Sequence, residues 1–377
     1  MTTLNLVLDE MLDPVPTGLS RYAGELANAL IEFAPSGCFV EGIVSASPED
    51  VYAQIADRLP GLSGLFKSAL TRRDLTAAWQ HGFTPVPSGM IHAPSLFAPL
   101  RSHDRVNGPR AQVAVTIHDV TAWTHPEQLA PRRVSWTKAM AQRALKYADA
   151  VVVPTHAVAA ELGEILPFGD RIRVLGAGVA PSLTEPIDAT ERAERLELPE
   201  RYLLTAGSAD ASSELPALLW ALALHTEIDL PLLIVGAGVN SAAVDAAVAV
   251  AGLADSRVRA LPQLSDADLA VVLARAEIFV YPTLVAGFGL PMLEALRLGV
   301  PVIHSDAPSL VEVAGDAGET VPSQDLAEYP RLLGDAIARL LEDSGLRMRL
   351  GVMGTDRAKL FTWRACAEGV WQLHADI

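Results

Sequence analysis

A glycine turn between a strand-like run and a helical segment is the feature of this sequence best suited to bind a ligand. The turn, Gly287-Phe288-Gly289, follows the apolar run Ile278–Tyr281 and precedes the helical pattern of residues 290–298, which begins at Leu290. Glycines let the backbone approach a ligand closely, and a helix N-terminus presents free N–H groups and a positive dipole end. The turn therefore favours a phosphate group. Glu294, in the first turns of the helix, is placed to accept hydrogen bonds from ligand hydroxyls.

A second candidate site follows another strand-like run, residues 113–117, which ends in His118 and Asp119. Polar residues at the carboxyl end of a strand lie where ligands bind in open parallel sheets. We expect His118 to line the site and Asp119 to orient its loop by accepting local hydrogen bonds. His92 lies in an apolar context, which is more typical of a satisfied packing residue than of a ligand-binding one.

The loop after residues 202–206 is a third candidate. It begins at Gly207 and Ser208 and carries Ser212 and Ser213, with Asp210 and Glu214 beside them. Serine hydroxyls can donate hydrogen bonds to phosphate, but they carry no charge. This loop therefore offers uncharged hydrogen-bond donors with two carboxylates beside them.

The elements that must position these residues alternate along the chain. Short strand-like runs are separated by helical patterns, which is typical of parallel sheets covered by helices. Strands are expected at residues 4–8, 39–44, 113–117, 150–153, 172–175, 202–206, 232–235, 258–261, 278–281 and 300–304. Residues 176–200 are rich in Gly, Pro and charge and predict a connection between two domains. The fold class is therefore α/β, with two Rossmann-like doubly wound domains facing a central cleft that holds the ligand.

These motifs together resemble the retaining family-4 glycosyltransferases, whose architecture is called GT-B. The family signature is Glu-x7-Glu around Gly-Phe-Gly-Leu-Pro; Glu294 matches its second Glu, and Ala286 stands where the first belongs. The family loop after the first strand of the second domain carries an Arg-Lys pair, and here Ser212 and Ser213 stand in those positions. Gly18-Leu19-Ser20-Arg21-Tyr22 looks like the glycine loop of the first domain.

The resemblance implies a role for each matched position. His118 is the expected catalytic residue, Gly18 approaches the diphosphate or the acceptor, and Glu294 binds the ribose hydroxyls. The expected donor-binding residues are Gly18, Gly207, Ser208, Ser212, Ser213, Ala286, Gly287, Phe288, Gly289, Leu290 and Glu294. The expected domains are an acceptor domain at 1–180, a donor domain at 181–357 and a helix at 358–377 that crosses back. Neither a metal ion nor a cofactor is expected, since loop donors and a helix dipole would stabilise the leaving diphosphate.

Two functions remain open at this point. The first is a glycosyltransferase that moves a hexose such as mannose from a nucleotide sugar, GDP-mannose above all, to a glycan or lipid-linked acceptor with retention. The second is a non-catalytic relative that binds a partner glycosyltransferase or a glycan. Ser212, Ser213 and Ala286 motivate the second, because they replace three donor-site side chains of the family.

Composition and rival motifs limit the alternatives. The net charge of −16 argues against nucleic-acid binding. No apolar run reaches the roughly 18 residues of a membrane span, and two cysteines are too few for a disulfide framework or a cysteine zinc site, so we expect a cytoplasmic protein. Gly236-x-Gly238 lacks the third glycine and the later acidic residue of a dinucleotide fingerprint. The basic segment at 131–147 is interpreted as a solvated surface helix, with peripheral contact at the inner face of a membrane as its alternative. Homo- and hetero-oligomers both remain open.

Overall fold

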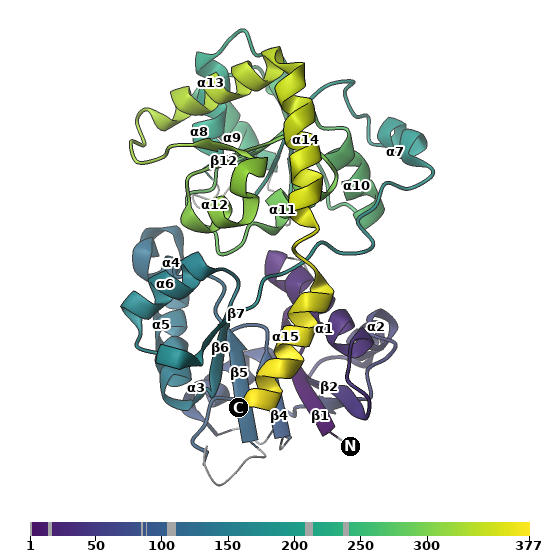
Figure 1. Cartoon of the computed structure of the whole chain (residues 1–377), viewed down its shortest axis with the longest axis vertical. Coiled ribbons are helices and arrows are strands. Elements are labelled where there is room, and N and C mark those ends of the chain that lie inside the picture. The colour runs from purple at the N-terminus through teal and green to yellow at the C-terminus, as the bar shows by residue number, and fades with distance from the viewer. Residues whose placement is uncertain are drawn as a thin grey trace. The chain divides into compact units, whose positions relative to one another are not determined.

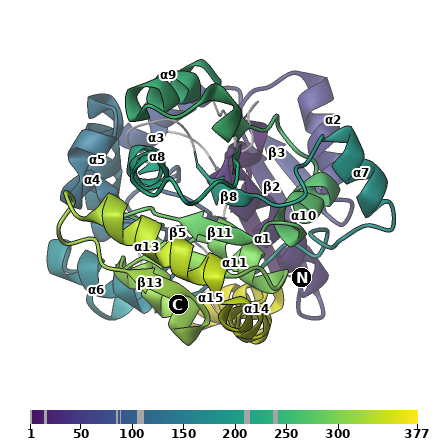
Figure 2. The same cartoon turned by 90° about the horizontal axis from the view of Figure 1, so that it is seen from above.

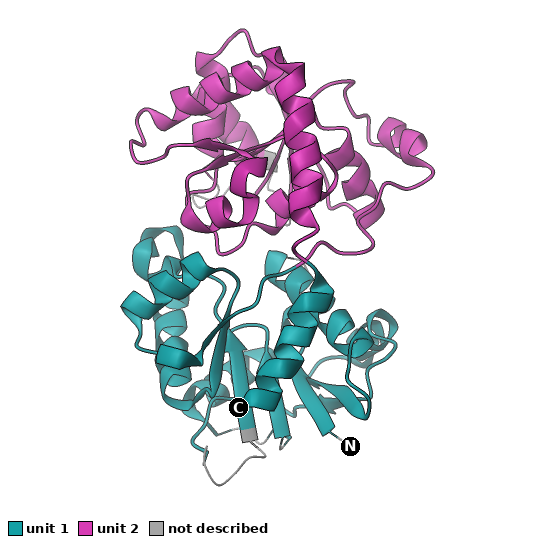
Figure 3. Ribbon diagram, viewed as in Figure 1, with its two compact units in different colours: residues 1–177, 362–377 teal, residues 178–361 magenta. Residues whose placement is uncertain are grey.

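The computed structural model describes residues 2–13, 17–83, 86–87, 89–103, 111–207, 214–236 and 241–377. It divides into two compact units (Figure 3). Unit 1 comprises Met1–Ala177 and Thr362–Ile377, and unit 2 comprises Gly178–Phe361. The loop positions Ser208, Ser212 and Ser213 lie outside the described residues.

Unit 1 is built on a parallel sheet of seven strands (Figure 1). Its order is β3-β2-β1-β4-β5-β6-β7, so the direction of strand addition reverses between β1 and β4. The strands are β1 (Thr2–Val7), β2 (Cys38–Val44), β3 (Gly64–Lys67), β4 (Gly89–Ala93), β5 (Ala111–Thr116), β6 (Ala150–Val153) and β7 (Ile172–Val174). Such a reversal is where open α/β sheets bind ligands, at the carboxyl ends of the strands.

Helices of unit 1 pack against this sheet and close its hydrophobic core. They are η1 (Asp9–Leu12), α1 (Gly18–Glu32), α2 (Glu49–Arg58), α3 (Arg72–His81), α4 (Thr121–Thr124), η2 (Pro126–Gln128), α5 (Pro131–Tyr147), α6 (His156–Ile165), η3 (Gly169–Arg171) and α15 (Trp363–Asp376). Thr17 and Ser20 form a reciprocal capping box that starts α1. The late helix α15 packs on α1, where Trp371 Nε1 donates to the Leu30 carbonyl at 3.1 Å.

Unit 2 repeats the architecture with a parallel sheet of six strands in the order β10-β9-β8-β11-β12-β13. The strands are β8 (Leu203–Ala206), β9 (Leu232–Val235), β10 (Val258–Ala260), β11 (Ile278–Tyr281), β12 (Val302–Ser305) and β13 (Glu319–Val321). The helices are α7 (Ala189–Arg195), α8 (Leu215–Leu224), α9 (Ser241–Ala251), η4 (Asp255–Arg257), α10 (Asp266–Ala274), α11 (Leu290–Arg297), α12 (Pro308–Ala314), η5 (Gly315–Ala317), α13 (Tyr329–Glu342) and α14 (Ser344–Ala358). Helices α8 and α13 pack against each other (Figure 2). The reversal lies between β8 and β11.

The predicted fold class of two parallel α/β domains is confirmed, although some elements differ from expectation. The expected connection at 176–200 contains helix α7, which packs on α10. Arg192 on α7 binds Asp188 at 2.7 Å and Asp268 at 2.8 Å, so a charged stretch without a long apolar period is still ordered. Strands β3, β4 and β13 were not predicted. β3 and β13 are short strands at a sheet edge with partly polar sequences, and β4, although central in its sheet, has Gly89 and His92 among its five residues.

Candidate functional site

The predicted donor residues of unit 2 gather at the reversal in its sheet. Gly207 follows β8, and the loop of residues 282–289 follows the neighbouring strand β11. Both lie at the carboxyl edge of the sheet, and α11 begins directly after the loop, at Leu290. The structure thus brings Gly207, Gly287 and Leu290 to the place where open α/β sheets bind ligands.

The loop after β11 is held in one conformation by hydroxyl groups from three neighbouring elements, β12, α12 and α13. Each hydroxyl donates a hydrogen bond to a backbone carbonyl of the loop. The pairs are Tyr329 to Pro282 at 2.9 Å, Ser305 to Thr283 at 2.5 Å, and Ser309 to Ala286. Because these carbonyls are already bonded within the protein, the loop is organised without a ligand. The Ala286 side chain is a methyl group and offers no hydrogen bond to a sugar.

Gly289 makes the turn into α11 and cannot be replaced without strain. Its φ is +81°, and a Cβ at this position would lie 2.5 Å from Leu310 Cδ2. No side-chain hydrogen bond caps the N-terminus of α11, which carries Pro291 in its first turn. Pro291 has no N–H, and the Leu293 N–H donates to the Gly289 carbonyl at 3.0 Å, so Leu290 and Met292 carry the N–H groups of this first turn that can serve an anionic ligand.

Glu294 is a buried carboxylate at this edge. It is 5 % exposed and lies on α11 between the buried residues Leu293 and Ala295. The charge of Glu294 acts on Tyr281, which lies at the end of β11. The pKa of Tyr281 is raised mainly by burial and further by the Glu294 charge, and a hydrogen bond with Thr283 opposes the rise. Carboxylates are rarely buried unless they serve a partner, so Glu294 is not an ordinary solvated residue of a surface helix.

The rival glycine motif after β9 has a structural explanation. Gly236 has a φ of +152°, and a Cβ there would approach the Gly207 carbonyl oxygen to 2.5 Å. The ends of β8 and β9 therefore pack backbone against backbone, and this contact requires glycine at position 236. Residues 237–240 lie outside the described part of the chain.

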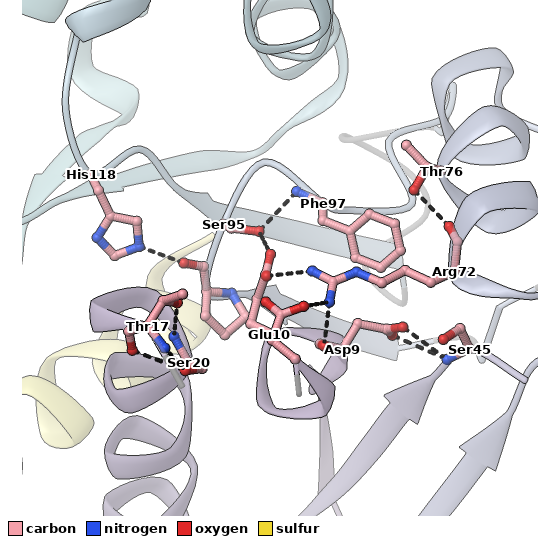
Figure 4. Close-up of polar contacts among 12 residues, drawn as sticks. Asp9, Glu10, Thr17, Ser20, Ser45, Arg72, Thr76, Ser95, Phe97 and His118 are labelled. Carbon is pink, nitrogen blue, oxygen red and sulfur yellow. Dashed lines mark hydrogen bonds and ion pairs between the residues drawn. The ribbon is translucent and has the colours of Figure 1, made fainter. Parts of the chain in front are cut away.

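At the corresponding reversal in unit 1, residues after β1, β4 and β5 come together (Figure 4). Glu10 lies on η1 after β1, Ser95 follows β4, and His118 follows β5. Ser95 Oγ donates to Glu10 Oε1 at 2.6 Å. His118 Nε2 lies 2.7 Å from the Pro94 carbonyl oxygen. The sequence motif at His118 thus forms one end of a connected polar network.

His118 is neutral and its tautomer follows from its partner. A carbonyl oxygen can only accept a hydrogen bond, so Nε2 carries the proton and Nδ1 retains a lone pair. Burial lowers the pKa of His118 from its ordinary value, which favours the neutral ring at pH 7. Asp119 Oδ1 accepts from the Thr121 amide at 2.9 Å, which confirms its predicted role in the loop. His118 can therefore accept a hydrogen bond from a substrate hydroxyl.

Gly18 and His92 occupy different environments. Gly18 is the exposed first residue of α1, and a Cβ there would meet nothing within 4 Å, so the surrounding structure does not require glycine. His92 lies within β4, is fully buried and contacts His374 with 5.6 Å between ring centroids. The packing role predicted for His92 is confirmed, but the expectation that its nitrogens are satisfied is wrong. Among the described residues neither ring nitrogen has a hydrogen-bond partner.

An arginine and its acidic partners complete the unit 1 network, although no sequence motif marks them as a site. Arg72, the first residue of α3, donates to Glu10 Oε2 at 2.7 Å and to the Asp9 carbonyl at 3.1 Å, and it also pairs with Asp13. The sequence did offer one signal for this network. Two adjacent carboxylates, Asp9 and Glu10, directly follow the strand-like run at 4–8. The arginine could not be assigned, because it lies about sixty residues further along the chain.

Asp9 should make the stability of the protein depend on pH in an unusual direction. Its side chain is fully buried, and both carboxylate oxygens accept from the Ser45 amide, at 3.2 and 3.1 Å. Burial raises the pKa of Asp9 from 3.8 to about 6. Because the folded state holds this proton more tightly, the contribution of Asp9 to stability is greatest below pH 4 and is lost as the pH rises through 6.

We expect Asp9→Asn to remove this dependence. A pKa change from 3.8 to about 6 corresponds to about 3 kcal/mol. The unfolding free energy of the variant relative to wild type should therefore rise by about 2.4 kcal/mol between pH 4 and pH 7, the rest of the effect lying below pH 4. Denaturant titrations across this range would measure it, with the exposed Asp57→Asn as control. Parallel profiles for wild type and Asp9→Asn would show that folding does not raise the pKa of Asp9.

The basic helix α5 is partly engaged within unit 1. Arg132 and Arg133 are exposed, whereas Arg143 donates to the Leu100 carbonyl and lies 5.0 Å from the Tyr147 ring centroid. None of the helices in the described residues is long and apolar enough to span a membrane. Contact of α5 with a membrane surface stays a prediction.

Two family models match the chain, one over most of each unit. The Glycosyltransferase Family 4 model matches residues 16–183, and the Glycosyl transferases group 1 model matches residues 200–343. With its two doubly wound units, the chain has the GT-B fold. It belongs to the family-4 glycosyltransferases.

Individual relatives are consistent with this assignment. O-antigen chain mannosyltransferase B of Escherichia coli is 27 % identical over 74 % of this chain and 71 % of its own length. MMP alpha-(1->4)-mannosyltransferase of Mycolicibacterium hassiacum is 27 % identical over 82 % of this chain and 79 % of its own. HepE of Anabaena, solved in complex with UDP and glucose, superposes with a TM-score of 0.73 at 15 % identity and covers all of both chains.

Proposed function

We propose that this protein transfers a hexose, mannose in the first instance, from a nucleoside-diphosphate sugar to a glycan acceptor with retention. The observation that carries the proposal is the edge of unit 2, where the Gly287–Gly289 turn, the N-terminus of α11 and the buried Glu294 lie together. The turn and helix N-terminus suit a diphosphate, and the carboxylate suits ribose hydroxyls. Two relatives named as mannosyltransferases support the choice of sugar.

In this proposal the chain positions the donor sugar and provides hydrogen-bonding groups around it. The uncapped N–H groups of α11 stabilise negative charge as the bond between sugar and diphosphate breaks. His118 accepts a hydrogen bond from a sugar hydroxyl through Nδ1, because its Nε2 proton is held by Pro94. GDP-mannose is the proposed donor, and the reaction needs no metal ion.

The acceptor is proposed to be an uncharged glycan hydroxyl. The network at the edge of unit 1 contains the carboxylates of Glu10 and Asp13 against the guanidinium of Arg72. A phosphate near this network would meet a cation that is already neutralised and an excess of negative charge. One unit charge about 6 Å from another costs roughly 3 kcal/mol at an effective dielectric constant near 20. We therefore expect a neutral mannose-terminated oligosaccharide to react more than tenfold faster than the same oligosaccharide carrying a phosphate, measured as product formed from GDP-mannose.

The second candidate function is a non-catalytic relative that binds a partner glycosyltransferase or a glycan. Ala286 favours it, because its methyl group cannot replace the carboxylate that the family signature has at this position. Ser212 and Ser213 also favour it, because they lack the positive charges of the Arg-Lys pair that the family loop carries. A protein of this kind would retain the fold and show no turnover with any nucleotide sugar.

Glu294→Gln should weaken nucleotide binding about 10- to 100-fold. Glutamine keeps the volume of the side chain but loses charge-assisted hydrogen bonds to ribose, which contribute about 1.5–3 kcal/mol each, or roughly one to two decades in affinity. Calorimetric titration with GDP, UDP and their sugars would measure the change. Glu319→Gln is the control, since Glu319 lies on β13 and pairs with Arg339. If the folded Glu294→Gln variant bound nucleotides as tightly as wild type, the role of this carboxylate would be structural only.

A further inference from the structure

Aromatic residues stand on both sides of the point where the chain passes from unit 2 to unit 1. Phe361 is the last residue of unit 2, and Trp363 is the first residue of α15 in unit 1. Thr362, between them, caps α15, with its side chain accepting from the Ala365 amide at 3.1 Å. The cap fixes where the helix begins, and one residue joins Phe361 to Trp363 along the chain.

On the unit 2 side, Phe361 packs against the predicted donor turn. The ring centroids of Phe361 and Phe288 are 5.5 Å apart, and the rings meet edge to face at 81°. Arg357 lies 5.2 Å from the Phe361 ring centroid and donates to the Glu312 and Val313 carbonyls of α12. Phe361 is thus held firmly, and a shift of the turn on ligand binding would press Phe288 against it.

On the unit 1 side, Trp363 packs against a residue that contacts His118. The Trp363 and Tyr22 ring centroids are 5.5 Å apart, and those of Tyr22 and His118 are 4.6 Å apart at 85°. Tyr22 is 3 % exposed and Trp363 is 6 % exposed. Closely packed interiors transmit displacement instead of absorbing it. His118 is therefore set between the Tyr22 ring and the Pro94 carbonyl.

We propose that Tyr22 and Trp363 are positioning residues that act with Phe361 to couple the state of the donor turn in unit 2 to the orientation of His118 in unit 1. Each ring contact lies within one unit, and the step between units is covalent. The coupling rests on the proposed function, because it takes the ligand of the turn to be a nucleoside diphosphate. Its consequence is that His118 reaches its working orientation when the donor site is filled.

The response of His118 to GDP tests this coupling. The Cε1–H signal of His118, assigned by its loss in His118→Gln, should shift when GDP binds to the full chain. Trp363→Leu should reduce that shift at least threefold while calorimetry shows GDP affinity within about threefold of wild type. Trp363→Phe keeps an aromatic ring and should therefore retain most of the GDP-induced shift of the His118 signal. Trp371→Leu is the matched control, because Trp371 anchors the same helix to Leu30 outside this row of contacts.

The outcomes separate this inference from the proposed function. If the shift is the same in Trp363→Leu and wild type, the nucleotide reaches His118 by another route and the coupling is wrong. If wild type binds GDP and His118 does not respond, the coupling is also wrong, and the proposed donor site stands. If no nucleotide binds, the proposed function fails and the coupling with it. Phe361→Leu leaves α15 intact and should reproduce the loss of shift even if Trp363→Leu fails to fold.

Discussion

Replacing Ser212 with Arg and Ser213 with Lys should strengthen nucleoside-diphosphate binding by about two to four orders of magnitude. Each charge-assisted hydrogen bond to phosphate contributes about 1.5–3 kcal/mol, and 1.4 kcal/mol is one decade in affinity. Asp210 and Glu214 flank the two positions and will pair with the new cations in part. We therefore expect a gain near the lower end of the range. Both serines lie outside the described residues, so the expectation comes from charge and from the family pattern.

The matched control is Ser212→Gln with Ser213→Gln, which supplies long donors without charge. Titration calorimetry with GDP at two salt concentrations would distinguish a charge effect, because only the basic pair should lose affinity steeply with salt. Adding Ala286→Glu should then permit transfer or hydrolysis of the donor sugar. If affinity does not rise in the folded basic variant, this loop does not hold the diphosphate. If affinity rises but no donor turns over, the protein is the non-catalytic relative.

His118→Ala should lower the rate of transfer by about two to three orders of magnitude and change GDP affinity by much less. Removing one preorganised polar group that stabilises the transition state typically costs about 10²- to 10³-fold in rate, and His118 presents Nδ1 in a fixed tautomer. A loss in kcat with little change in nucleotide affinity marks an interaction made mainly in the transition state. Steady-state kinetics with GDP-mannose would measure it, with the exposed His81→Ala as control. Full activity in the His118→Ala variant would show that His118 only stabilises its loop and takes no part in the reaction.

The pattern of apolar runs predicted the parts of this fold that depend on local sequence. Strands β6, β9 and β11 are short apolar runs between turn signals, and each was placed correctly because burial on both faces of a parallel sheet requires such a sequence. The Gly287–Gly289 turn was found from its two glycines between a strand-like run and a helical pattern, and Gly289 there takes a φ of +81°. Edge strands β3 and β13 are not buried on both faces, so their sequences are not continuous apolar runs and could not be recognised in this way.

Contacts between distant segments were beyond the reach of the sequence. The position of Arg72 depends on how far α3 lies from η1 in space, and nothing in its own neighbourhood indicates that Glu10 and Asp13 will hold it. The hydroxyl groups that brace the loop after β11 likewise come from later elements. Glu294 was assigned through the resemblance, and its burial then showed why it differs from a surface glutamate.

The return of the chain to unit 1 has a consequence for synthesis on the ribosome. The first part of unit 1, up to Ala177, emerges early, but α15 emerges only after all of unit 2. At the usual rate of elongation this delay is roughly 10–40 s, during which the face of α1 that contains Tyr22 and Leu30 has no covering helix. A nascent or truncated chain would therefore offer an apolar surface to chaperones or proteases. The Tyr22 ring that packs on His118 is therefore supported by Trp363 only once synthesis has passed position 363.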